Sequence, residues 1–263
     1  MLYELKKTTY PKISPLFQDA QYSQLFVKAM LEGNHVGNIF VDNPERPAAA
    51  LLAPLCGFYF LAGRADNAAF NQTMRERILS EFVSPEGDLL LFPTSAVWQS
   101  ALEALFRDYK LLHVARKAFT FYLERFAAHH TAWRERIPEG YTIQRYDRRL
   151  AEDTELADFW GSLDNFLAQG VGFAVLKGDE VVSRCHAVMV GNGEAEISIE
   201  TTEAYRRQGF AKLAACAFIE HCLAHSLHPA WSCWDENTPS QILAHKLGFN
   251  HPVDAPAIYA KVK

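Results

Sequence analysis

The chain has 263 residues, of which 49% are hydrophobic and 22% are charged, so it can bury a hydrophobic core and does not have the composition of a disordered protein. Residues 1–128 carry 13 basic and 13 acidic side chains, whereas residues 129–263 carry 13 basic and 18 acidic ones. This balance offers no basic stripe for nucleic acid, and the acidic second half favours a cationic small molecule as partner.

The sequence shows no targeting or membrane signal. The opening MLYELKKTTYPK has no apolar run after its charges, so it is not typical of a secretory signal. The most apolar window, residues 48–63, is interrupted by Pro54 and is shorter than the roughly 20 apolar residues of a membrane helix. Five cysteines occur without C-x-x-C spacing, which argues against a disulfide framework or a zinc site. We therefore expect a soluble cytoplasmic protein without a bound metal.

The first half alternates predicted strands and helices. Strands are expected within residues 37–63, a helix over 67–82, a strand over 88–92, a helix over 95–106 and final strands within 110–123. Around residues 127–140 the periodic apolar pattern gives way to charged residues that end in Pro and Gly. We predict a domain over residues 1–128, a linker over 129–140 and a second domain over 141–263.

The second half begins with a predicted strand over residues 141–146 and helical segments over 153–170. Three strands follow within residues 171–201, separated by the turn sequences at 177–179 and 191–193, which are typical of β-hairpins. The pattern predicts an antiparallel meander.

A helix is predicted to begin at Phe210, with apolar residues on one face. After a short strand over 230–234, a second helix is expected with Thr238 as its N-cap, Pro239 at its first position and Gln241 completing a capping box. A last strand is expected over 257–262. Because both halves follow a similar order of elements, they are either structural copies or two examples of ordinary α/β alternation.

The turn before Phe210 has the chemistry of an anion site. The first N–H groups of a helix have no intrahelical partner, and a glycine such as Gly209 lets an anion approach the backbone. Ala211 is small, and Arg206, Arg207 and Lys212 add positive charge. The alternative is that Gly209 only permits a tight turn and that the arginines are solvated.

These residues resemble the coenzyme A pyrophosphate loop of the GCN5-related N-acetyltransferases (GNATs), whose pattern is R/Q-x-x-G-x-G/A. Downstream, Asn237, Ser240 and the sequence KLGF resemble the strand and helix that face the cofactor in that family. The finer pattern is similar to the branch that includes the zwittermicin A resistance acetyltransferase. The resemblance covers residues 141–263 well and the first half only as a degenerate copy.

The resemblance implies an α/β GNAT fold, in which a mixed, mostly antiparallel sheet is flanked by helices, and an enzyme that transfers acetyl from acetyl-CoA to a primary amine of a small molecule or peptide. The cofactor would lie between two diverging strands and contact the backbone of Ile199 and Thr201. The loop residues Gln208 and Phe210 would complete the cofactor site with the residues named above. A monomer and a homodimer are both compatible with the sequence.

An alkylammonium must lose a proton before it can attack, so the reaction requires a base. Glu200 is the first choice and Glu196 the second, because strict strand alternation places both on one face, where each raises the pKa of the other. The N–H of Thr201 would polarise the thioester oxygen. The alternative is that both glutamates are ordinary solvent-facing strand residues.

One position departs from the family pattern. Many members carry a tyrosine in the last helix that protonates the leaving thiolate, and here that position is Ala244. His245, Tyr205 or Tyr259 would substitute for it, or no acid is needed, since a thiol of pKa about 8.5 leaves as its anion. The departure keeps a non-catalytic acyl-CoA binder or sensor open as an alternative, together with a small-molecule-binding domain that takes no CoA.

Overall fold

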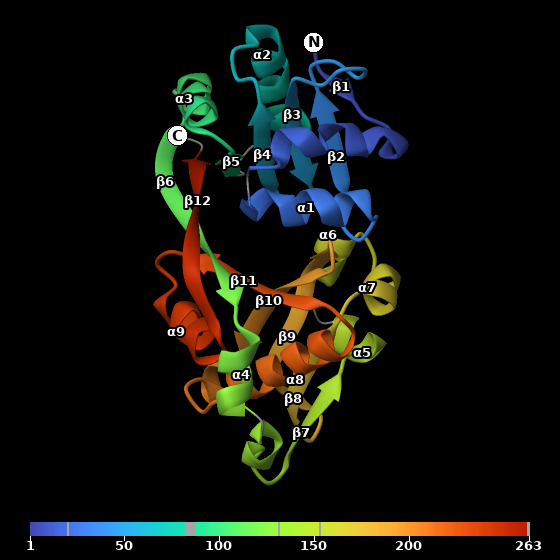
Figure 1. The fold of residues 1–263 in the computed structure, drawn as a ribbon, viewed down its shortest axis with the longest axis vertical. Coiled ribbons are helices and arrows are strands. Elements are labelled where there is room, and N and C mark those ends of the chain that lie inside the picture. The colour runs from blue at the N-terminus through green and yellow to red at the C-terminus, as the bar shows by residue number, and fades with distance from the viewer. Residues whose placement is uncertain (20, 83–87, 131, 153, 262–263) are drawn as a thin grey trace. The chain divides into compact units, whose positions relative to one another are not determined.

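The computed structural model describes residues 1–19, 21–82, 88–130, 132–152 and 154–261 and divides the chain into two compact units. Unit 1 contains Met1–Arg116 and Asp254–Lys263, and unit 2 contains Lys117–Val253 (Figure 1). Both units consist of β-sheet and helices, in agreement with the predicted fold class. No helix among the described residues is long and apolar enough to cross a membrane.

The helices and strands of unit 1 lead into β6, a strand that continues into unit 2. In chain order they are β1 (Tyr3–Glu4), the 3-10 helix η1 (Lys7–Phe17), α1 (Gln21–Leu31), β2 (Gly37–Val41), β3 (Ala49–Pro54), β4 (Phe58–Gly63), α2 (Ala68–Arg77), the π-helical turn η2 (Ile78–Phe82), β5 (Leu89–Pro93), α3 (Ala96–Leu105) and β6 (Lys110–Phe121). The strand order is β1-β2-β3-β4-β5, and the end of the last strand of the chain, β12, pairs with β5.

Unit 2 contains the remaining elements. They are α4 (Leu123–His130), the 3-10 helix η3 (Trp133–Arg136), β7 (Tyr141–Arg145), α5 (Arg148–Glu152), α6 (Leu156–Trp160), α7 (Leu163–Gln169), β8 (Gly172–Lys177), β9 (Glu180–Gly191), β10 (Glu194–Thr201), the 3-10 turn η4 (Glu203–Tyr205), α8 (Phe210–Ala224), β11 (His228–Trp234), α9 (Thr238–Lys246) and β12 (Phe249–Lys261), which ends in unit 1. The strand order is β6-β11-β10-β9-β8-β7.

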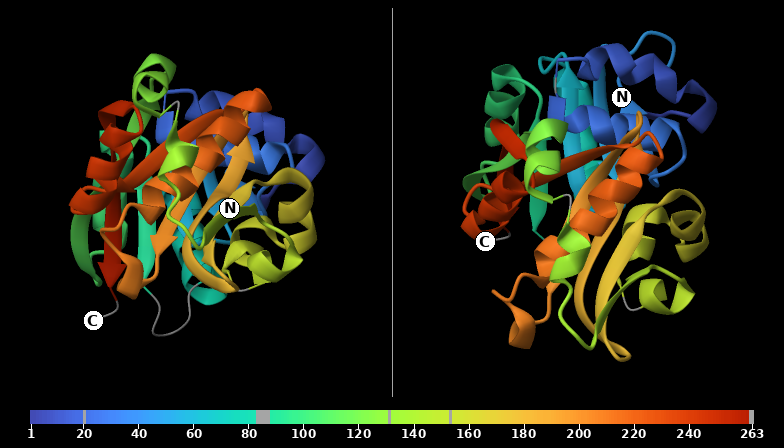
Figure 2. Two further views of the ribbon diagram at one scale, coloured as in Figure 1. Left: turned by 90° about the horizontal axis from the view of Figure 1, so that it is seen from below. Right: turned by 60° about the horizontal axis from the view of Figure 1, so that its bottom comes forward.

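The predicted meander of unit 2 is present. Strands β8, β9 and β10 pair antiparallel, and the second hairpin turn holds Asn192 and Gly193 at φ of 55° and 74°. These positive φ values are those of the turn that suits a two-residue hairpin. Helix α8 packs across the meander (Figures 1 and 2). Phe218 and Cys222 on this helix are fully buried. The buried face of α8 fixes where its N-terminus lies relative to β10.

The two units differ from the predicted domains at both boundaries. Strand β6 carries the chain from unit 1 into unit 2 at Lys117, and the pairing of Ile258 with Leu91 places the end of the chain in unit 1. These long-range pairings cannot be deduced from local patterns. Residue 131 of the predicted linker, residue 153 of the predicted helical segment, residue 262 of the predicted last strand and residue 263 lie outside the described residues.

The described residues of the predicted linker pack against unit 2. Trp133 is 3% exposed, and its indole Nε1 donates to the Glu220 carboxylate of α8 at 2.5 Å. His130 is 2% exposed, and its Nε2 lies 2.7 Å from the carbonyl oxygen of Lys246. Arg134 of the same stretch forms an ion pair with Glu220, so this part of the chain packs against α8.

Candidate functional site

Strands β10 and β11 begin as parallel neighbours and then separate. Their pairing runs from Glu194 with His228 to Glu196 with Ala230, whereas β10 stays paired with β9 up to Thr201. An opening therefore begins beyond Glu196 along the edge of β10 that faces β11. The equivalent parallel pair in unit 1, β4 with β5, stays paired from Phe58 to Leu61 and shows no such separation.

Backbone groups of β10 point into this opening. The carbonyl of Glu200 accepts from Ser183 Oγ on β9 at 2.8 Å, and the N–H of Thr202 donates to the Val182 carbonyl at 3.0 Å. Because successive peptide groups of a strand point in opposite directions, the N–H groups of Ile199 and Thr201 are directed away from β9. The predicted backbone contacts thus lie where an extended ligand could pair with β10.

The turn between β10 and α8 has the backbone of an anion site. Arg207 has a φ of 62°, which is uncommon for a residue with a side chain, and Gly209 has a φ of 92° just before the first residue of α8. A Cβ added at Gly209 would meet no heavy atom within 4 Å, so the glycine faces open space. The start of α8 is therefore accessible to a ligand.

A groove of about 900 Å³ connects the opening between β10 and β11, the turn before α8 and one face of α9. It is lined by most of the predicted cofactor residues: Ile199, Thr201, Arg206, Arg207, Gly209, Phe210, Ala211, Lys212, Asn237 and Ser240. Gln208 does not line it, because its side-chain amide turns back to donate to the Ala204 carbonyl at 3.1 Å.

The groove carries an excess of positive charge. Four cationic residues line it, Arg206, Arg207, Lys212 and Lys246, and Glu203 is the acidic residue among the lining residues. Burial lowers the pKa of the Lys212 ammonium, and the positive charges of Arg136 and Lys246 lower it further. Sequence reasoning missed Lys246, although its spacing from Pro239 and Leu243 along a helix places the three on one face.

The two predicted carboxylates lie on the face of β10 that points away from α8. Ala195 and Ile197 are buried in the core that includes α8, so Glu196 and Glu200 project from the opposite side of the strand. Glu196 is 7% exposed at the inner end of the opening and accepts a hydrogen bond from Ser232 Oγ of β11 at 2.5 Å. Glu200 is exposed to solvent nearer the mouth.

Two titratable residues that the sequence did not single out lie on the same face as the glutamates. His186 of β9 is the register partner of Ser198, and the Tyr146 hydroxyl lies 3.3 Å from His186 Nδ1. Burial lowers the pKa of His186 to about 4, and burial raises the pKa of Tyr146. Both side chains are therefore neutral at pH 7 and act as hydrogen-bonding groups.

The position expected to hold a tyrosine is a buried alanine. Ala244 is 0% exposed on the inner side of α9. Tyr205 lines the groove, but its hydroxyl donates to Glu180 Oε2 at 2.8 Å, which raises its pKa. His245 Nδ1 lies 3.2 Å from the Phe249 carbonyl oxygen, and Tyr259 belongs to unit 1, where it donates to Asp88. Of the three predicted substitutes, Tyr205 is the one that lines the groove.

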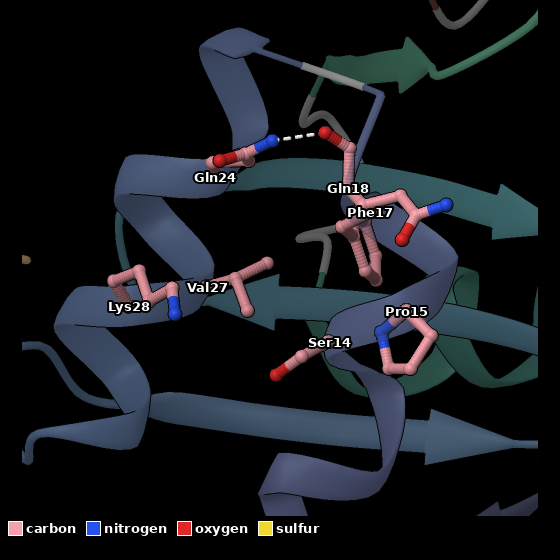
Figure 3. A pocket seen from close by; sticks show the side chains of 7 residues that line it. All are labelled: Ser14, Pro15, Phe17, Gln18, Gln24, Val27 and Lys28. Atoms are coloured by element: carbon pink, nitrogen blue, oxygen red, sulfur yellow. Dashed lines mark hydrogen bonds between the residues drawn. The ribbon is translucent and has the colours of Figure 1, made fainter.

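Unit 1 has a smaller pocket of about 310 Å³ between η1 and α1 (Figure 3). Phe17 and Val27 form its apolar wall, and the Gln24 side chain donates to the Gln18 carbonyl at its edge. Lys28 is the cationic residue among its lining residues. The pocket contains none of the predicted site residues.

Comparison with known proteins gives consistent matches over nearly the whole chain. A family model described as GNAT acetyltransferase matches residues 14–257. The chain is 30% identical over 266 residues to YdfB of Bacillus subtilis strain 168, an uncharacterized N-acetyltransferase, with 99% of each chain covered.

Solved structures show the same fold. A GCN5-related N-acetyltransferase-like protein from Streptococcus suis is similar with a TM-score of 0.75 and 24% identity over 97% of this chain and 99% of that one. A tandem GNAT protein from the clavulanic acid biosynthesis pathway is similar with a TM-score of 0.65 and 13% identity over 99% and 97% of the two chains. These likenesses confirm the predicted fold class.

Proposed function

The chain belongs to the GNAT acetyltransferase family and is an acyltransferase, and we propose that it transfers the acetyl group of acetyl-CoA to a primary amine of a small molecule or peptide. The observation that carries this proposal is the opening between β10 and β11, which continues into a cationic groove at the start of α8. Residues 141–253 supply every described residue of that groove.

The groove fits coenzyme A in charge and in backbone geometry. The N–H groups at the start of α8, together with Arg206 and Arg207, would hold the pyrophosphate, and Gly209 leaves room for it. The N–H and carbonyl of Ile199 and the carbonyl of Thr201 would pair with the amides of the pantetheine arm, which leaves the N–H of Thr201 for the thioester. When bound, acetyl-CoA supplies a thioester that is open to attack by an amine. Asn237 and Ser240 would contact the arm from α9.

The base would come from the face of β10 that points away from α8. We assign this role first to Glu200, because an exposed carboxylate can take a proton from an ammonium through water and release it to solvent. Glu196 is the second candidate, and its position at the inner end of the opening, where Ser232 holds it, favours it on geometry. The N–H of Thr201 would polarise the thioester carbonyl as charge develops on its oxygen.

The test is acetyl-CoA turnover with a panel of amines by wild type, Glu200→Gln and Glu196→Gln. Removal of the base should lower kcat/KM about 10²- to 10⁴-fold and leave the Kd for CoA within about twofold of wild type. The matched control is Glu152→Gln, an exposed carboxylate of α5 outside the groove. A loss confined to the Glu196 variant would transfer the role to Glu196.

The amine panel should include an amine antibiotic, because the sequence resembles the branch with the zwittermicin A resistance acetyltransferase. Polyamines and peptides with a free N-terminus represent the other acceptor classes. Tight binding of CoA without turnover of any amine would favour a sensor, an outcome consistent with the alanine at position 244. Absence of CoA binding would contradict the proposal altogether.

A further inference from the structure

Strand β9 carries a histidine on the face of the sheet that holds the proposed base. His186 is the register partner of Ser198 on β10 and of Gly172 on β8, so it lies in the middle of three paired strands. Glu200 is two residues beyond Ser198 on the same face, which places its Cβ about 7 Å from that of His186. A small molecule that contacts Glu200 can therefore reach the histidine as well.

The ring of His186 is held from one side by Tyr146. The Tyr146 hydroxyl lies 3.3 Å from His186 Nδ1, and the two ring centroids are 5.8 Å apart. Gly172 makes this arrangement possible, because a Cβ at that position would lie 2.8 Å from the Tyr146 ring. Phe166 of α7 packs against the same ring in an edge-to-face contact, with a centroid distance of 5.9 Å. Packing therefore holds the tyrosine hydroxyl against the histidine.

This contact determines which nitrogen of His186 carries the proton. Tyr146 is 8% exposed, and its hydroxyl has no other hydrogen-bond partner among the described residues, so donation to Nδ1 is the arrangement that satisfies its proton. A neutral imidazole that accepts at Nδ1 carries its own proton on Nε2. Burial and the positive charge of Arg184 lower the pKa of His186 to about 4, so the ring is neutral at pH 7.

The proton on Nε2 has no acceptor among the residues that the structure describes. Tyr146 is the hydrogen-bond partner of the ring, and Nε2 is not one of the described side-chain nitrogens that are buried without a partner. Solvent or a ligand can therefore reach it. Nearby, Ser198 is partly exposed and Glu200 is exposed. An open N–H donor beside a carboxylate suits a ligand that offers an ammonium group to one and an oxygen to the other.

We propose that His186, positioned by Tyr146, donates from Nε2 to an oxygen of the acceptor molecule. The preferred acceptors are then primary amines with a hydrogen-bond-accepting oxygen close to the amino group, either an amide carbonyl, as at a peptide N-terminus, or the hydroxyl of an amino alcohol. This inference rests on the proposed function, because it names the acceptor class of the same reaction. His186 is a specificity-determining residue and Tyr146 a positioning residue, and the proton transfer stays with Glu200.

The first experiment measures kcat/KM for glycinamide, ethanolamine and propylamine, three small amines of which the last has no oxygen. Each amine is compared between variants, so the different basicities of the amines cancel. His186→Leu should lower kcat/KM about 10-fold for the acceptor whose oxygen is bound and less than about twofold for propylamine. His186→Gln should keep most of the preference, because its amide can donate in place of Nε2–H. A loss for glycinamide identifies a carbonyl, and a loss for ethanolamine identifies a hydroxyl.

The second experiment tests the positioning by Tyr146. Proton–nitrogen correlation NMR of the ligand-free protein at pH 7 should show His186 as the Nε2–H tautomer in wild type and as a mixture of tautomers in Tyr146→Phe. The same variant should raise KM for the oxygen-bearing acceptor about 2- to 5-fold with little change in kcat, because the hydrogen bond binds ground state and transition state alike. Tyr3→Phe, at an exposed tyrosine of unit 1, is the matched control and should leave the NMR spectrum of His186 and the kinetics unchanged.

An Nδ1–H tautomer in wild type, or equal losses for all three amines in His186→Leu, would overturn the inference while leaving acetyl transfer intact. If His186→Leu does not fold, the wild-type NMR spectrum and the kinetics of Tyr146→Phe decide instead. Failure of wild type to acetylate any amine, while His186 keeps its proton on Nε2, would overturn the proposed function.

Discussion

Gly209 has a backbone that few other residues adopt, since its φ is 92° and a Cβ there would point into open space. Gly209→Ala should cost about 1–2 kcal/mol of folding free energy through backbone strain, and its methyl group would also stand where the phosphates approach. We expect a weaker affinity for CoA, measured by calorimetry, together with a lower urea midpoint.

The matched control for this change is Gly193→Ala. Gly193 has a φ of 74°, also faces open space and lies in the β9–β10 hairpin. This variant should lose a similar amount of stability but keep its affinity for CoA. Equal affinities for CoA in the two variants would show that Gly209 serves only to form the turn.

His186 makes the stability of the protein dependent on pH. Its folded pKa of about 4 lies below the ordinary value of 6.5, so between these pH values the unfolded chain binds a proton that the folded chain does not. The contribution of His186 is therefore complete above pH 6.5 and is lost as the pH falls through 4. His221 has the same shift and adds to the effect.

We expect the urea midpoint of wild type to fall as the pH is lowered from 6.5 to 4.5. It should fall less in His186→Gln, because the glutamine side chain does not bind a proton in this range. His129→Gln, at an exposed histidine of α4, is the control and should follow wild type. A pH dependence in His186→Gln as steep as that of wild type would contradict the assignment.

At the scale of the element, the start of α9 differs by one residue from the prediction. The N-cap is Asn237, whose Oδ1 accepts from the N–H of Ser240 at 3.2 Å, and Thr238 is the first helical residue. The Gln241 side chain donates to the Asp235 carbonyl instead of completing a capping box with Thr238. Asparagine and threonine are both good caps, so the sequence allowed either.

This difference predicts unequal effects of two neighbouring substitutions. Asn237→Ala should destabilise the protein by about 1 kcal/mol and weaken CoA binding, because it removes a cap that also lines the groove. Thr238→Ala should change the free energy of unfolding by less than about 0.5 kcal/mol. Thermal or urea unfolding of the two variants side by side would measure this difference, and a larger loss in Thr238→Ala would contradict the observed cap.

Elements with strong local signals were predictable, and their long-range partners were not. The glycines of the hairpins and of the 206–211 turn impose local geometry, so the β8–β10 meander and the start of α8 agree with the sequence pattern. By contrast, the pairing of β12 with β5 and the separation of β10 from β11 depend on contacts between distant residues. Lys246 was missed for the same reason, because packing decides which face of α9 meets the groove.

At the scale of the whole molecule, the two units repeat one order of elements but differ where a cofactor would enter. In unit 1, β4 and β5 stay paired up to Leu61 and Pro93, where β5 ends, and the N–H of Thr94 extends the pairing by donating to the Leu61 carbonyl at 3.0 Å. The residues that follow β4 include Asp66, which forms a bidentate pair with Arg64, so these two charges offset each other where unit 2 has its cationic turn.

This difference predicts one coenzyme A per chain. Calorimetric titration of the full chain should give a stoichiometry of about one, and the variant Arg206→Glu, which reverses a charge in the unit 2 groove, should lower the affinity of that single site without revealing a second. Arg64→Glu, which breaks the pair with Asp66 in unit 1, is the matched charge reversal and should leave both stoichiometry and affinity unchanged. A stoichiometry of two would show that unit 1 keeps a cofactor site of its own despite its closed pair of strands. The same conclusion would follow if Arg206→Glu retained some CoA binding and the double variant with Arg64→Glu lost it.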